Sequence, residues 1–285
     1  MAKTWLITGT SSGFGKELAQ IVASKQDTNL VAAARKMEDL NYLDQFDSNK
    51  IKKVIIDVTN QSEIKDAVSK AKEKFGTIDV LVNNAGLGYF STIEESDMDQ
   101  VRYMFEVNVF GLANMTNAVL PIMRTQKSGV IVNLSSALAL TTLPTMGFYS
   151  ATKYAVEGYA DTLRQEVADL GIHVMNVEPS GARTNWSGRS SNKVVPNISD
   201  YQEFGNSIVH VSDSVTGAPG NPQKIAEVIY NQIEDNEVIP EHLPLGQFAY
   251  EGGLGNLENL ISEIKSRQEI SLSTDDSLLG EKYEL

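Results

Sequence analysis

The sequence predicts a three-layer α/β fold, in which helices cover both faces of a doubly wound parallel sheet. Short apolar runs alternate with helix-like stretches through most of the 285 residues, and this alternation is typical of parallel strands that are buried on both faces. The strand-like runs end at Thr8, Ala34, Val58, Val82, Leu134 and Glu178. Because ligands bind beyond the carboxyl ends of such strands, we expect the segments that follow them to meet at one edge of the sheet.

The first apolar run, Trp5-Leu6-Ile7, leads into a glycine-rich stretch and then a helix-like segment from Lys16 to Val22. Glycines permit tight turns and the close approach of a pyrophosphate, whose charge is attracted to a helix N-terminus. The spacing matches neither G-x-G-x-x-G nor a Walker A loop, and a hairpin or a plain helix cap is the alternative. The candidate phosphate-binding residues are Gly9, Ser11, Ser12, Gly13, Phe14 and Gly15.

The second strand-like run, residues 29–34, is followed by two cations, Arg35 and Lys36. Arg35 lies twenty positions after Gly15, where a dinucleotide site usually has an acid for the ribose 2′-hydroxyl and where an arginine instead accommodates a 2′-phosphate. The pair therefore favours NADP(H) over NAD(H), although a solvated basic pair after a strand is the alternative.

Tyr149 and Lys153 are four residues apart, so that on a helix they share one face. A phenol is a weak acid near neutral pH, and a neighbouring ammonium lowers its pKa toward the range that is useful for acid–base chemistry. The pair is a candidate catalytic unit.

Together with these features, further short motifs make the chain resemble the short-chain dehydrogenase/reductase family, in its shorter single-domain branch. The motifs occur in the family's order: Thr8 to Gly15, Asp57-Val58, Asn83-Asn84-Ala85-Gly86, Asn108 in Val107 to Gly111, Ser135-Ser136, Tyr149 with Lys153, and Pro179 to Thr184. The resemblance implies a Rossmann-type sheet and nicotinamide-dependent chemistry. The segment 243–246 and the late helix look similar to bacterial reductases related to hydroxysteroid and retinol dehydrogenases.

The resemblance also implies a role for each matching residue. The catalytic tetrad would be Asn108, Ser136, Tyr149 and Lys153, with Ser136 preferred to Ser135 because it stands thirteen residues before Tyr149. The cofactor would meet Asp57 and Val58 at the adenine, Asn83, Ala85 and Gly86 at the adenosine ribose, Tyr149 and Lys153 at the nicotinamide end, and Pro179, Ala182 and Thr184 around the carboxamide. One departure is Pro179-Ser180 in place of the family's Pro-Gly, which puts only the local turn in question.

Composition excludes several other classes of function. The chain has no cysteine, and His173, His210 and His242 lack ligand spacing, so we expect no metal site. A net charge of −13 should repel nucleic acid and anionic membranes. We also expect no signal peptide, no membrane helix and a cytoplasmic location.

Residues 1–270 are predicted to form a single dinucleotide-binding and catalytic domain, although the length also permits two domains. Residues 187–222, polar with scattered apolar side chains, are interpreted as a substrate lid, with a disordered insertion as the alternative. Leucines and isoleucines at helical spacing predict an amphipathic helix over 254–268 that docks on its own body, or else on a partner subunit. Residues 271–285 are expected to be a mobile acidic tail.

The resulting hypothesis is an NADP(H)-dependent oxidoreductase that interconverts a carbonyl and a secondary alcohol. Four apolar residues, Leu138, Leu143, Met146 and Trp186, indicate a moderately hydrophobic small-molecule substrate. The alternatives are a dinucleotide-binding sensor or scaffold without turnover and an epimerase or dehydratase of the family's longer branch. The resemblance also implies a homodimer or homotetramer that pairs through residues 111–124 and 152–169.

Overall fold

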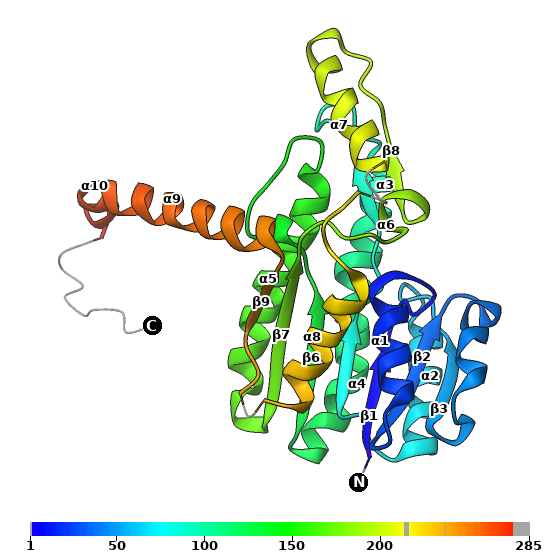
Figure 1. Cartoon of the computed structure of the whole chain (residues 1–285). Helices are drawn as coiled ribbons and strands as arrows, with labels where there is room; N and C mark the ends of the chain where they lie inside the picture. Colours follow the sequence, from blue (N-terminus) through cyan, green and yellow to red (C-terminus); the bar gives the residue numbers. More distant parts are fainter. Residues whose placement is uncertain (1, 214–216, 237, 276–285) are drawn as a thin grey trace.

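A seven-stranded parallel sheet organises the chain (Figure 1). The computed structural model describes residues 2–213, 217–236 and 238–275. The strand order is β3-β2-β1-β4-β6-β7-β9, and every neighbouring pair is parallel. The strands are β1 (Lys3–Ile7), β2 (Thr28–Ala34), β3 (Ile51–Ile55), β4 (Val80–Asn83), β6 (Gly129–Leu134), β7 (Ile172–Pro179) and β9 (His242–Leu245). The predicted Rossmann-type fold is confirmed.

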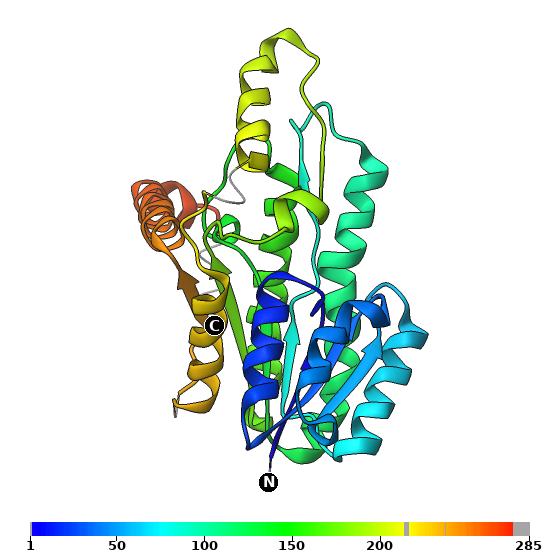
Figure 2. The ribbon, with the colours of Figure 1, turned by 45° about the vertical axis from the view of Figure 1, so that its right-hand side comes forward.

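Helices cover the two faces of the sheet and bury alternate residues of each strand (Figures 1 and 2). One layer consists of α1 (Gly13–Ser24) and α8 (Pro222–Glu234), and the other of α2 (Gln61–Phe75), α4 (Leu112–Gln126) and α5 (Gly147–Val167). On β1, Trp5 and Ile7 face the first layer, whereas Leu6 faces the second. This two-sided burial explains the continuous apolar runs in the sequence.

Local sequence signals set the ends of several helices. The Asn60 side chain accepts a hydrogen bond from Ser62 N at 3.0 Å and caps α2, which ends at Gly76 with φ +79°. Asn221 caps α8 in the same way, and Pro222 occupies its first turn.

The predicted strand ends lie close to the observed ones, apart from that of β3. This strand ends at Ile55 rather than Val58, because Ile55 is the last residue that pairs with β2, whose own end is Ala34. The seventh strand, β9, was not predicted, and its Pro244 is tolerated because β9 lies at the edge of the sheet.

Residues 187–222 are folded over the part that the structure describes, which argues against a disordered insertion. They contribute α6 (Trp186–Arg189), β8 (Ser191–Lys193) and α7 (Gln202–Asp213). Strand β8 pairs in parallel with β5 (Gly88–Phe90), next to α3 (Met98–Phe105). These elements rise above the carboxyl edge of the main sheet (Figure 1).

The late amphipathic helix exists, its apolar side chains are not packed on the body, and where it docks stays a prediction. Helix α9 (Gly253–Ser266) and the short α10 (Gln268–Leu272) extend away from the body (Figures 1 and 2). The apolar side chains of α9 are between 43% and 59% exposed, namely Leu254, Leu257, Leu260, Ile261 and Ile264. Residues 276–285 of the predicted acidic tail lie outside the described residues.

Within the described ranges, no helix combines the length and the apolar character that crossing a bilayer requires. The cytoplasmic location stays a prediction.

A pair of leucine substitutions tests this architecture. Leu6 is fully buried, so Leu6→Ala should lower the free energy of unfolding by about 2–5 kcal/mol. Leu257 is 43% exposed on α9, and Leu257→Ala should change it by less than about 0.5 kcal/mol. Urea denaturation followed by circular dichroism measures both values. A loss at Leu257 as large as that at Leu6 would show that α9 is packed in solution.

Candidate active site

A cavity of about 440 Å³ lies at the carboxyl ends of the sheet strands. Predicted site residues from every part of the sequence line it. They are Gly9, Ser11, Ser12, Gly13, Phe14, Arg35, Asp57, Val58, Ala85, Gly86, Ser136, Leu138, Leu143, Met146, Tyr149, Lys153, Pro179, Ala182, Thr184 and Trp186. Gly15, Lys36, Asn83 and Asn108 were also predicted but are not part of the cavity wall.

The glycine-rich turn is held against the end of β4. Gly9 and Gly13 have φ values of +68° and +56°, which glycine adopts without strain. The Asn84 amide donates to Thr8 O at 2.8 Å and to Gly9 O at 3.0 Å. A side chain at Gly9 would approach Ala85 Cα to 2.9 Å, so the turn has room only for glycine there.

The turn leaves the start of α1 open toward the cavity. Ser12 is the N-cap residue of α1, and its side chain makes no capping hydrogen bond. Ser12, Gly13 and Phe14 all line the cavity, so the first N–H groups of the helix are available to an anion. A dinucleotide pyrophosphate fits this arrangement.

The two cations after β2 are in different surroundings. Arg35 lines the cavity, whereas the Lys36 ammonium lies 3.9 Å from the Glu38 carboxylate and its side chain is 64% exposed. Asp57 also lines the cavity, and its carboxylate accepts hydrogen bonds from the backbone and the hydroxyl of Thr59. Of the predicted pair, only Arg35 faces the space that a cofactor would use.

Asn83 was expected to pass its backbone beside the adenosine ribose, and the structure shows where its side chain points. Its side chain points into the molecule, where it donates to Thr116 Oγ1 at 3.1 Å and to Asn133 Oδ1 at 3.0 Å. Asn83 is the last residue of β4, and its side chain lies under α4, while a role of its backbone at the ribose stays a prediction. Ala85 and Gly86, which follow the strand, do face the cavity.

Helix α5 brings Tyr149 and Lys153 to the cavity on one face, as the four-residue spacing predicts. The Lys153 ammonium donates to Leu134 O at 2.7 Å and lies 5.6 Å from the centre of the Tyr149 ring. Ser136 follows β6, and its hydroxyl accepts a hydrogen bond from Leu138 N at 3.1 Å.

Burial dominates the acidity of this pair. It raises the pKa of Tyr149, and hydrogen bonding with Ser136 partly opposes the rise. Burial lowers the pKa of Lys153 to about 8, and the charge of Glu157 opposes that fall. The sequence predicts a Tyr149 phenol whose pKa is lowered by Lys153, whereas the structure has a phenol that is harder to ionise because it is desolvated.

Asn108 lies next to the cavity, in a π-helical turn over Glu106–Gly111. Its side-chain amide forms two hydrogen bonds with the backbone of Leu87. The amide oxygen accepts from Leu87 N at 2.7 Å, and the amide nitrogen donates to Leu87 O at 2.9 Å. A third bond joins it to Thr152 Oγ1 at 3.1 Å. Asn108 therefore fixes the backbone beside Gly86, and π-turns of this kind often occur at functional sites.

An apolar wall stands next to Tyr149. The Trp186 ring centre is 4.9 Å from that of Tyr149 and 5.8 Å from that of Phe90. Ile208 of α7 is buried in the same cluster as Leu138 and Met146. The segment predicted as a lid thus contributes directly to this wall.

Sequence reasoning missed three aromatic residues of the cavity, Phe90, Tyr103 and Phe248. Phe248 begins a second π-helical turn, Phe248–Gly252, which leads into α9. Ser180 anchors this turn, because its hydroxyl accepts a hydrogen bond from Ala249 N at 2.8 Å. The serine in place of the family's glycine therefore holds the turn at Phe248. The only sequence signal for this role was that Ser180 follows Pro179, where the family has glycine.

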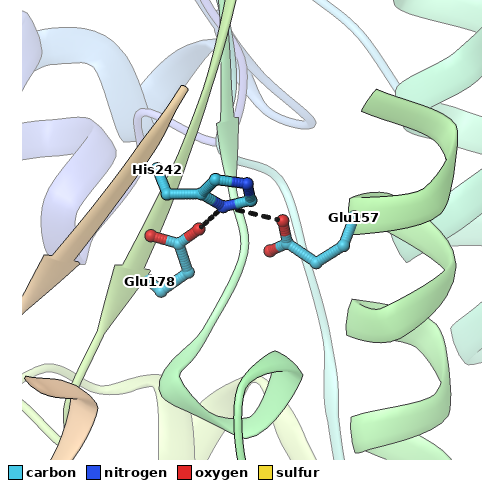
Figure 3. Close-up of side chains that lie close together, drawn as sticks. All are labelled: Glu157, Glu178 and His242. Atoms are coloured by element: carbon cyan, nitrogen blue, oxygen red, sulfur yellow. Dashed lines mark hydrogen bonds and ion pairs between the residues drawn. The ribbon is translucent and has the colours of Figure 1, made fainter. Parts of the chain in front are cut away.

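Glu157, Glu178 and His242 form a second group of polar side chains (Figure 3), and none of them lines the cavity. Atoms of Glu157, Glu178 and His242 that could bind a metal lie within 4.8 Å of one another, although the three histidines show no ligand spacing in the sequence. These side chains already bind one another and their neighbours, with His242 Nδ1 2.9 Å from the Glu178 carboxylate. We interpret the group as an ion pair between two carboxylates and an imidazole.

Comparison with protein families gives one match over most of the chain. The model described as short chain dehydrogenase matches residues 3–194. An oxidoreductase of Botryotinia fuckeliana, BOA17, is 36% identical over 96% of this chain and 100% of its own length. A 3-ketodihydrosphingosine reductase of Bacteroides thetaiotaomicron is 37% identical over 70% of this chain and 71% of its own length.

Solved structures show the same relationship. A short-chain dehydrogenase from Streptomyces avermitilis superposes with a TM-score of 0.87 at 33% identity, over 97% of this chain and 99% of that one. An alcohol dehydrogenase from Thermococcus sibiricus, complexed with 5-hydroxy-NADP, gives a TM-score of 0.70 at 25% identity, over 85% and 95%. The protein therefore belongs to the short-chain dehydrogenase/reductase family of oxidoreductases.

Proposed function

We propose that the protein is an NADP(H)-dependent oxidoreductase that interconverts a carbonyl and a secondary alcohol on a moderately hydrophobic small molecule. One observation carries the proposal: Ser136, Tyr149 and Lys153 meet in the same cavity as the anion-binding turn and the apolar wall. A reductase of a keto compound among the relatives is consistent with this substrate class.

Each residue of the group has a chemical task in carbonyl reduction. Nicotinamide dinucleotide, when bound, supplies the hydride. The Tyr149 hydroxyl protonates the carbonyl oxygen, and its raised pKa keeps it protonated near neutral pH. The Ser136 hydroxyl donates a hydrogen bond to the same oxygen and stabilises the developing negative charge.

Lys153 and Asn108 support this step. The Lys153 ammonium favours the phenolate that remains after proton transfer, and it would hold the nicotinamide ribose. Asn108 acts through position, because its amide fixes the backbone at Leu87. A water-mediated path for protons from Lys153 past Asn108 to solvent remains a prediction.

The wall around the reacting group supports an apolar substrate. Leu138, Met146 and Trp186 face the cavity beside Tyr149, and Phe90 and Phe248 extend the same surface. A flat or branched hydrocarbon portion would bury against these side chains, while the carbonyl points to Ser136 and Tyr149. A panel of ketones and aldehydes assayed by NADPH absorbance tests the proposal and separates an enzyme from a sensor without turnover.

Substitution of the proton donor gives the first functional prediction. Tyr149→Phe keeps the ring against Trp186 but removes the hydroxyl, so turnover should fall by about 10²- to 10⁴-fold while NADPH still binds. Steady-state kinetics and fluorescence titration measure the two effects. Tyr154→Phe, on the exposed side of the same helix, is the control and should keep its activity. Near wild-type turnover in Tyr149→Phe would remove Tyr149 from the mechanism.

Cofactor choice should depend on Arg35 and not on Lys36. A charge-assisted contact to a 2′-phosphate is worth about 1.5–3 kcal/mol, or roughly ten- to a hundredfold in affinity. Arg35→Ala should therefore weaken NADPH binding by that factor and leave NADH binding nearly unchanged. Lys36→Ala is the matched control, because Lys36 faces Glu38. Equal affinities for NADPH and NADH in the wild type would contradict the NADP(H) preference.

We also propose that the protein forms a homodimer or homotetramer through the surfaces of α4 and α5. Tyr154 on α5 is 43% exposed, and Phe110, in the π-helical turn directly before α4, is 53% exposed; such side chains are commonly covered in oligomers. Light scattering at micromolar concentration should give at least twice the chain mass of 31.2 kDa. Phe110→Glu should dissociate the assembly, and Leu257→Glu on α9 should not. A monomeric wild type would contradict the proposal, and dissociation by the α9 variant alone would move the interface to that helix.

A further inference from the structure

A row of polar side chains crosses the sheet beneath the active site. Asn83 on β4, Asn133 on β6, Asn176 on β7 and His242 on β9 occupy paired positions on successive strands. The three asparagines, which we call the asparagine row, are at most 4% exposed. Burying an amide costs free energy unless it is hydrogen-bonded. The hydrogen bonds of the asparagine row therefore bear on the charge state of the group at its end, Glu157.

The hydrogen bonds of the asparagine row all run in one direction. Asn83 Nδ2 donates to Asn133 Oδ1, and Asn133 Nδ2 donates to Asn176 Oδ1, each at 3.0 Å. Asn176 Nδ2 then donates to Glu157 Oε2. A hydrogen bond from an amide is stronger to a charged carboxylate than to a neutral carboxyl, so the bond from Asn176 lowers the pKa of Glu157 and favours its ionised form.

Glu157 contacts the active site from two sides. It lies one helical turn after Lys153 on α5, and its negative charge favours the ammonium form of Lys153. Its second carboxylate oxygen accepts a hydrogen bond from the Ser135 hydroxyl, next to Ser136. Lys153 in turn donates to Leu134 O, so Glu157, Lys153 and the end of β6 form one connected unit.

On its other side Glu157 faces His242, which lies between Glu157 and Glu178 (Figure 3). His242 Nδ1 lies 2.9 Å from Glu178 Oε1 and 3.5 Å from Glu157 Oε2, and the imidazole side chain is 45% exposed. Glu178 is fully buried, and its second oxygen accepts from Leu243 N at 2.9 Å. Two other charged groups face the ring from α5: Asp161, 4.0 Å from Nε2, and Arg164.

We propose that Glu157 is a positioning residue for the reaction, and that His242 connects its charge state to the solvent at the β9 edge of the sheet. The inference rests on the proposed oxidoreductase function, in which Lys153 must be an ammonium to support Tyr149. It assigns a task to a buried carboxylate and an edge imidazole that are not part of the cavity wall.

The sign of each charge coupling is fixed by the groups involved. The hydrogen bond to Glu178 raises the pKa of His242, despite its partial burial. A protonated His242 lowers the pKa of Glu157, opposing the rise that burial and Glu178 cause. An ionised Glu157 raises the pKa of Lys153. When rising pH removes the His242 proton, the negative charge on Glu157 is less favoured and Lys153 loses its own proton more easily.

The pH dependence of kcat/KM for carbonyl reduction tests the effect on Lys153. Glu157→Gln keeps the side-chain shape and an acceptor for Asn176, but removes the charge. The alkaline limb of its profile should move down by about one pH unit. His242→Gln should move the limb in the same direction by a smaller amount. Glu166→Gln, an exposed carboxylate on the same helix, is the control and should leave the profile unchanged. An alkaline limb in Glu157→Gln that coincides with the wild-type limb would overturn the proposal.

Two measurements without turnover distinguish this inference from the proposed function. NMR titration of the imidazole carbons, with His242 assigned by His242→Gln, should show that its pKa falls in Glu157→Gln and in Glu178→Gln. NADPH affinity should be lost at lower pH in Glu157→Gln than in the wild type, because the Lys153 ammonium disappears earlier. Unchanged values in both measurements would refute the coupling, whereas a wild type without turnover but with these shifts would refute only the enzyme assignment. A His242 titration that changes on addition of EDTA would identify a metal site and overturn the ion-pair interpretation.

Discussion

Two-sided burial of a parallel sheet is the constraint on which the site depends. Since every strand points the same way and both faces are covered by helices, the chain can leave the layers only at the strand ends. The segments after β1, β2, β4, β6 and β7 therefore meet at one edge, and the cavity is lined by residues from all of them. Local features then decide the chemistry of that edge. Gly9 and Gly13, with their positive φ angles, shape the turn before α1, and one face of α5 carries Tyr149 and Lys153.

The parts that the sequence predicted are those that depend on local spacing. The glycine-rich turn directly follows an apolar run, and Tyr149 and Lys153 share a helix face at a separation of four, so neither needs knowledge of distant contacts. Strand β9 could not be predicted, because His-Leu-Pro-Leu is short and contains a proline, and only pairing with β7 makes it a strand. The cavity positions of Phe90 and Phe248 likewise depend on the assembled layers. The inward direction of the Asn83 side chain also depends on the sheet, since neighbouring residues of a strand point to opposite faces.

The acidity of the reacting pair reflects two opposing demands. A dry pocket strengthens the hydrogen bond from Ser136 and favours hydride chemistry without competing water, but it also makes both Tyr149 and Lys153 harder to charge. A positive charge that must persist in such a place needs a nearby negative one. We propose that Glu157, one turn after Lys153 on α5, supplies this negative charge. Hydrogen bonds from Ser135 and Asn176, rather than from solvent, stabilise its carboxylate.

Such an arrangement has a structural consequence beyond the site. Apolar side chains in place of Asn83, Asn133 and Asn176 could be buried in more than one register of the strands. The three amides, in contrast, must hydrogen-bond one another across the sheet, which is possible only in one alignment of β4, β6 and β7. The hydrogen bond from Asn176, which opposes the rise in the pKa of Glu157 on burial, thus belongs to the same row that fixes the relative positions of the strand ends that carry Ser136 and Pro179. The proposed coupling from His242 to Glu157 therefore uses the same strand pairing that aligns β7 with β9.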